Sequence, residues 1–247
     1  MLFQTFQTIR TFCCRLRDDS ISAFAAQAAF FIILSFIPFI MFLFTLLNFF
    51  PMTPDDFKRL PAGALSGIAA LWSASRGMLA LIHGLNAVYK HKETRNYFLI
   101  RAIAMVYTLC FAILLIITLV FLVFGNRLYE WIMSQFPLLS DPAFFIMNLR
   151  SFGTMAILTI FFLLLYLVVP NRKSKLLAEL PGAVLTAGGW IGFSFLFSFY
   201  IDHQTNHSFT YGSLTTLAFS MLWLYFCMYI LFVGAEINVF LSNDKDR

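Results

Sequence analysis

Six apolar runs, each about as long as a bilayer is thick, constrain this chain more than any other feature. A helix needs about 20 consecutive apolar residues to cross the hydrocarbon core of a membrane. Inside lipid every backbone N–H and C=O must be paired within its own segment, so such runs fold as α-helices. The sequence therefore predicts an all-α fold, a polytopic transmembrane helical bundle of about six spans. The predicted spans cover residues 22–50, 62–89, 102–124, 144–169, 182–201 and 212–241.

The composition supports a membrane domain and argues against a soluble enzyme. Of the 247 residues, 60% are apolar and only 12% are charged, whereas soluble domains carry about 25% charge. Ahead of the first span, apolar residues from Leu2 to Leu16 recur at helical spacing, which predicts an N-terminal interfacial amphipathic helix. The expected organisation is an interfacial helix at 1–20, a six-span transmembrane domain at 21–242 and a cytoplasmic tail at 243–247.

The distribution of Lys and Arg predicts the orientation in the membrane. Segments on one side hold 12 of the 17 basic residues, and the loops on the other side hold three. Cytoplasmic segments carry such an excess, so both termini are predicted to be cytoplasmic, in the cell inner membrane. This bias also accounts for the net charge of +5, and no nucleic-acid partner is expected. The 12 residues are Arg10, Arg15, Arg17, Lys90, Lys92, Arg95, Arg101, Arg172, Lys173, Lys175, Lys245 and Arg247.

Polar residues in the second span form the first candidate site. A charged side chain at the membrane centre costs roughly 2.5–3.5 kcal/mol on insertion scales, so Arg76 must face protein or water. His83 lies seven residues further on, nearly on the same helical face, and Asn86 is offset by less than a quarter turn. This stripe predicts either a substrate or ion pathway or a set of hydrogen bonds between helices.

Two further groups of polar residues lie near span ends. Glu236 is a carboxylate inside the apolar sixth span, followed by Asn238. Both are candidates for the same pathway, and the expected partner of Glu236 is a backbone amide or Arg101. Arg150 and Asp202 lie near the opposite surface on consecutive spans and are expected to form a structural ion pair.

Proline and glycine mark helix breaks and close packing. Pro38 lies in the second half of the first span, where it predicts a kink or a break. Pro181 is expected to open the fifth span, and Gly188 and Gly192 form a GxxxG motif that favours close helix approach.

No catalytic or metal-binding motif occurs. The chain has no GxSxG, HExxH, P-loop or GxGxxG. His203 and His207 are four residues apart without an evident third ligand, and the four cysteines include no CxxC. The sequence therefore predicts no enzymatic activity, no metal and no cofactor.

Several motifs together resemble the YihY/BrkB family of bacterial inner-membrane proteins, the virulence factor BrkB family formerly mislabelled ribonuclease BN. They are AAFFIILSFIPFI, LWSASRGMLALIHGLNAVY, LPGAVLTAGGW, YGSL and LWLYFCMYILFVGAEIN, in that order along the chain. The resemblance implies six transmembrane helices, no settled biochemical activity and a role in handling envelope lipids or solutes. It marks as motif positions Pro38, Trp72, Arg76, Asn86, Pro181, Gly182, Tyr211, Gly212, Gly234, Glu236 and Asn238.

These observations leave two hypotheses for function. The first is a transporter or lipid translocator for an anionic lipid or solute, with Arg76 offering charge to a group such as a phosphate. The second is a non-transporting scaffold or regulator that binds lipid or a partner protein. Membrane lipids are expected partners in both cases, and the sequence leaves the oligomeric state open.

Overall fold

The computed structural model describes residues 10, 15–17, 19–48, 60–113, 116, 142–172, 174–204 and 212–245. These residues are helical in each of the six predicted span regions and contain no strand, which confirms the all-α fold. Arg10 and residues 15–17 are helical, residues 19 and 20 form a turn before α2, and the other residues of the predicted interfacial helix lie outside the described part. The helices are α2 (Ile21–Asn48), α3 (Leu60–Val88), the Tyr97–Ile113 helix, α5 (Pro142–Val168), α6 (Leu176–Gln204) and α7 (Gly212–Lys245).

The helices have the length and surface of membrane spans. Four of them contain stretches long and apolar enough to cross a bilayer: Ile21–Thr45, Ser66–Val88, Leu176–His203 and Leu214–Ser242. Shorter apolar stretches are described at Tyr97–Ile113 and Thr154–Val168. Large apolar side chains such as Ile37, Phe98 and Phe195 are about 70% exposed on the outside of the bundle. Exposure of this kind is unfavourable in water and suits lipid, so the protein is a helical membrane bundle.

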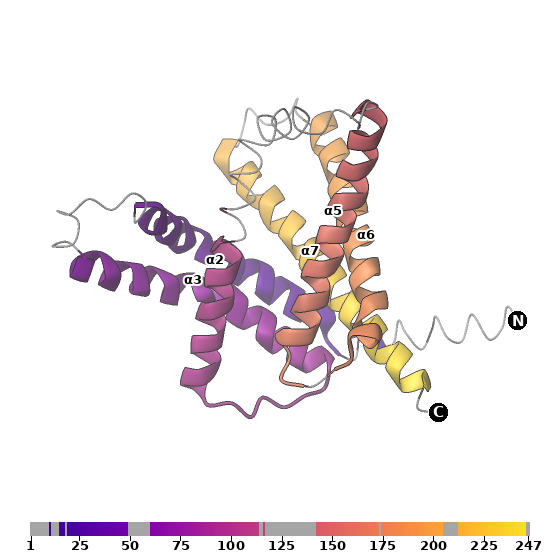
Figure 1. Cartoon of the computed structure of the whole chain (residues 1–247), viewed down its shortest axis with the longest axis horizontal. Helices are drawn as coiled ribbons and strands as arrows, with labels where there is room; N and C mark the ends of the chain where they lie inside the picture. The colour runs from indigo at the N-terminus through magenta and orange to yellow at the C-terminus, as the bar shows by residue number, and fades with distance from the viewer. Residues whose placement is uncertain are drawn as a thin grey trace, which may run out of the picture.

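Helix α7 joins two groups of helices. α2 packs along α3, α6 packs against α5 and α7, and α7 also contacts α2 and α3. Figure 1 shows α2 and α3 diverging from α5 and α6 toward one side, while the opposite ends of these helices gather near the C-terminal half of α7. The Tyr97–Ile113 helix bridges the groups, because the ring of Phe111 lies 6.0 Å from Phe39 of α2 and 6.4 Å from Phe161 of α5. The hydrogen-bonded side chains around Glu179 and Asn86, described below, lie at the gathered ends.

Two helices contain a proline that the sequence analysis singled out. α2 runs without interruption through Pro38, so the first span is not broken there. The nearby Ser35 hydroxyl accepts a hydrogen bond from the backbone N–H of Gly77 on α3, at 3.2 Å. α6 begins at Leu176, six residues before the predicted start of the span, and contains Pro181. Pro181 therefore does not open this helix: it removes one backbone hydrogen bond near the helix start, and the helix forms around it.

Candidate functional site

A buried carboxylate, Glu179 near the start of α6, organises the gathered helix ends. It is 1% exposed. Its Oε2 accepts hydrogen bonds from Tyr89 Oη at 2.7 Å and Asn238 Nδ2 at 2.9 Å, and its Oε1 pairs with Arg172. The Arg172 guanidinium also lies 3.5 Å from the centre of the Tyr89 ring. These four residues, the Glu179 cluster, place a buried charge among partners that satisfy it, as a buried ion pair requires.

Tyr89, just beyond the end of α3, has its titration altered by this cluster. Burial raises the pKa of Tyr89 well above its ordinary value, and the neighbouring Glu179 charge and hydrogen bond raise it further. Tyr89 therefore keeps its proton in the folded protein, and its hydroxyl donates a hydrogen bond to the Glu179 carboxylate.

Helices α6 and α7 meet at direct backbone contact beside the cluster. A Cβ added at Gly182 would lie 2.2 Å from the carbonyl oxygen of Gly234, and one added at Gly234 would lie 1.9 Å from Thr186 Oγ1. Asn238 Oδ1 accepts the backbone N–H of Gly182 at 2.7 Å. Tyr166 of α5 bonds Thr186 Oγ1 at 2.7 Å and, also at 2.7 Å, donates to the carbonyl of Leu231. Three helices are thereby fixed at one point.

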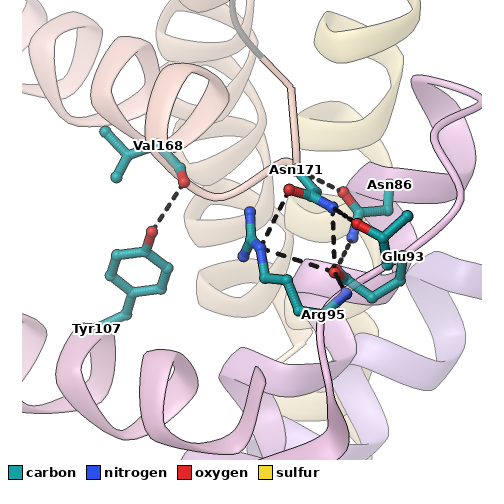
Figure 2. A network of polar contacts seen from close by, with 7 residues as sticks. Asn86, Glu93, Arg95, Tyr107, Val168 and Asn171 are labelled. Atoms are coloured by element: carbon teal, nitrogen blue, oxygen red, sulfur yellow. Dashed lines mark hydrogen bonds and ion pairs between the residues drawn. The ribbon is translucent and has the colours of Figure 1, made fainter. Parts of the chain in front are cut away.

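A second set of hydrogen bonds ties the end of α3 to two loops (Figure 2). Asn86 donates to Glu93 Oε2 at 2.6 Å and accepts the backbone N–H of Asn171 at 2.9 Å. Asn171 in turn bonds Glu93 at 3.3 Å and Thr94 at 3.0 Å, and Arg95 Nε donates to Asn171 Oδ1 at 3.1 Å. We call these five residues the Asn86 network. It joins α3, the loop before the Tyr97–Ile113 helix and the loop after α5.

Arg101 is a buried cation without an acidic partner in the described residues. It is 2% exposed. Its Nη2 donates to the carbonyl of Trp72 at 2.5 Å, its guanidinium lies 4.6 Å from the Trp72 ring, and its Nε has no partner. The titratable groups that act on it are Tyr97 and a second cation, Arg76. We call Arg76 and Arg101 the arginine pair.

The arginine pair lies beside the middle of α3. Arg101 is the fifth residue of the Tyr97–Ile113 helix, whereas Trp72 lies 16 residues before the end of α3. The start of the Tyr97–Ile113 helix therefore lies beside the middle of α3, so the adjoining ends of these two helices are not at the same height in the bundle.

The predicted polar stripe of α3 divides into two parts. Arg76 and His83 are exposed, whereas Asn86 is 4% exposed and belongs to the Asn86 network. On α7, Asn238 belongs to the Glu179 cluster. Glu236 is 0% exposed and neither of its carboxylate oxygens has a hydrogen-bond partner in the described residues. Its expected partner Arg101 bonds Trp72 instead.

The remaining predicted positions are spread over the bundle. A Cβ at Gly188 would make an ordinary 3.7 Å contact with Met155, and one at Gly192 would meet nothing within 4 Å. The close helix approach therefore lies at Gly182 and Gly234 and not at the GxxxG motif. Trp72 is 38% exposed, Asp202 is exposed near the end of α6, and Gly212 begins α7. Tyr211 and the side chain of Arg150 lie outside the described part, so the predicted Arg150–Asp202 pair stays a prediction.

Sequence reasoning did not single out Glu179, Asn171 or Tyr166. It counted Arg172 and Arg101 among the cytoplasmic cations and considered Arg101 only as a partner of Glu236. One signal was available for Glu179, since it is an acid in an otherwise apolar segment two residues before Pro181. Among the described residues, no group of three or more His, Cys, Asp or Glu could hold a metal ion.

Comparison with known proteins assigns the chain to a family. A profile of the virulence factor BrkB family matches residues 58–247. A Bacillus subtilis (strain 168) protein named ribonuclease-like protein YfkH is 33% identical over 248 residues, covering 90% of each chain. UPF0761 membrane proteins of Pseudoalteromonas atlantica and Pseudoalteromonas translucida are 24% and 25% identical, covering 93% and 94% of this chain and 84% of each relative. No solved structure matches. This membrane protein therefore belongs to the virulence factor BrkB family.

Proposed function

We propose that this protein is a transporter or lipid translocator for an anionic lipid or solute of the cell envelope, acting in the inner membrane with both termini cytoplasmic. The observation that carries the proposal is the arginine pair: a buried Arg101 beside an exposed Arg76, with no acid paired to either among the described residues. The proposal assigns the protein no enzymatic activity, and membrane lipids are its partners.

A buried cation needs a compensating negative charge. Burying an unpaired charge costs several kcal/mol, so buried charges are paired or they bind ions. Within the described residues, ion pairs join Lys90 to Asp19, Arg95 to Glu93 and Arg172 to Glu179. None of them involves the arginine pair. An anionic ligand would supply the missing charge.

The geometry of Arg101 suits a phosphate or a similar anion. The carbonyl and ring of Trp72 hold the guanidinium from one side, and this cation–π contact stabilises the charge without neutralising it. The unpartnered Nε leaves a donor for an incoming oxygen. Guanidinium groups bind phosphate through paired N–H donors. Arg76 is exposed and would meet the anion first.

A scaffold or regulator that binds lipid or a partner protein is the second candidate. The Glu179 cluster and the Asn86 network favour it, because their hydrogen bonds tie α3, α6, α7 and two loops into one rigid end. A rigid end of this kind could present a docking face without any movement of substrate. A transporter moves substrate across the membrane and a scaffold does not, so a measurement of net substrate flux distinguishes the two functions.

The test is translocation by the purified full-length chain in liposomes. Fluorescent phosphatidylglycerol and phosphatidylcholine are followed by dithionite quenching, and inorganic phosphate uptake is measured in parallel. We expect transport of the anionic lipid or of phosphate, and little transport of phosphatidylcholine. Arg76→Gln and Arg101→Gln should each lower the rate about 10- to 100-fold, because a hydrogen bond to a charged group contributes about 1.5–3 kcal/mol. Lys92→Gln is the matched control, since Lys92 is an exposed loop cation. Rates equal to those of protein-free liposomes would refute transport and favour the scaffold.

A further inference from the structure

Three carboxylate oxygens are buried without partners near the gathered helix ends. Two belong to Glu236 of α7, which is 0% exposed, and the third is Oδ2 of Asp19, in the turn before α2. The other oxygen of Asp19 pairs with Lys90 at 3.2 Å. An ionised carboxylate with no hydrogen bond would cost several kcal/mol at such a site. The Glu236 carboxyl group therefore needs a proton or a cation.

The charged groups around Glu236 favour a proton over a metal cation as its ligand. The charged groups that face it are Asp19, Lys90 and Arg15. On α6, which packs against α7, the nearby acid is Glu179, and its partners already satisfy it. A metal cation would lie close to the Lys90 ammonium and would have only two carboxylates to bind it. A proton binds to a single carboxylate oxygen and needs no further ligands.

The exposed fraction of the side chain falls from Lys90 to Asp19 to Glu236. The side chain of Lys90 is 59% exposed and that of Asp19 is 14% exposed, while Glu236 is fully buried. Lys90 adopts a left-handed backbone conformation with φ of 56°, and Ser20, which follows Asp19, has φ of 51°. The ion pair is therefore held by two tight turns, and both of its members act on the buried Glu236.

We propose that Glu236 and Asp19 form a proton-binding site that exchanges with the predicted cytoplasmic side past Lys90. Water delivers the proton to a carboxylate oxygen of Glu236, which becomes a neutral carboxylic acid, and release returns the proton by the same route. Asp19 pairs with Lys90 through its other carboxylate oxygen and is the acid that acts on Glu236. The site is separate from the arginine pair, so it exists whether or not the protein moves lipid.

Infrared difference spectroscopy of the full-length protein in lipid vesicles tests the site. A protonated carboxyl group has a C=O stretching band that carboxylates lack and that shifts in deuterated water. We expect this band near pH 7, where ordinary Asp and Glu side chains are ionised, and its loss in Glu236→Gln. In Asp19→Asn the band should disappear at a lower pH than in the wild type, because a like charge has been removed.

The matched control is Glu179→Gln, which removes a buried acid that is paired with Arg172 and should leave the band unchanged. If that variant does not fold, Glu93→Gln serves the same purpose. Absence of the band in the wild type near pH 7, or its persistence in Glu236→Gln, would overturn the proposal. A transport defect without loss of the band would concern the arginine pair alone.

Discussion

Replacing Gly182 with alanine should destabilise the protein strongly. The added Cβ would lie 2.2 Å from the Gly234 carbonyl oxygen and 2.5 Å from the amide atoms of Asn238. Overpacking costs about 1–3 kcal/mol, and here the obstacle is backbone, which places the cost at the upper end. Separating the helices would also weaken the hydrogen bond from the Gly182 N–H to Asn238, and a buried donor left unpaired costs about 1–3 kcal/mol more. The expected loss is about 3–5 kcal/mol.

The assay is thermal unfolding of the purified protein in detergent, followed with a thiol-reactive dye. Cys227 is fully buried, so its reaction with the dye reports loss of the bundle. For a chain of this size the expected loss corresponds to an apparent Tm lower by roughly 6–20 °C. Gly192→Ala is the matched control on the same helix, because a Cβ there meets nothing within 4 Å. A Gly182→Ala protein as stable as Gly192→Ala would refute the reasoning.

Three further predictions concern the helix ends. Glu179→Ala should cost about 3–5 kcal/mol because Arg172 loses its buried partner, and adding Arg172→Met should restore part of the Tm; equal Tm losses in both proteins would contradict this. Because Tyr89 keeps its proton when folded, stability should fall above pH ~10, where the unfolded chain ionises, and fall less steeply in Tyr89→Phe. Tyr166→Phe should cost about 1–3 kcal/mol, measured by the same assay, because the Leu231 carbonyl loses its donor.

The helices could be predicted from the sequence because a bilayer allows few alternatives. Apolar length and the need to pair every backbone group fix helix number and approximate bounds, and α2, α3 and α5 begin and end within two residues of their predicted limits. The start of α6 could not be predicted in this way. Pro181 is typical of a helix start, but tertiary contacts at Gly182 and Glu179 keep the preceding residues helical.

The candidate sites depend on contacts between distant segments, and a single sequence does not contain them. A GxxxG motif places small residues on one helix face, but it does not tell whether another helix lies against that face. The contact that forms joins Gly182 and Gly234, which share no local pattern. Likewise, Arg76 could be recognised from its intramembrane charge, whereas Arg101 became significant only through its burial against Trp72.

Water access and anion binding at the arginine pair form the central claim, and a single thiol introduced by Ser73→Cys tests both. Ser73 is partly exposed and lies one helical turn before Arg76, so this substitution leaves both arginines in place. The four native cysteines are first replaced. A membrane-impermeant thiol reagent should label the introduced thiol in phosphatidylcholine vesicles, and phosphatidylglycerol should slow that labelling unless Arg101→Gln is also present. Absence of labelling at position 73 beside a well-labelled Lys92→Cys control, or labelling that phosphatidylglycerol does not change, would contradict the account.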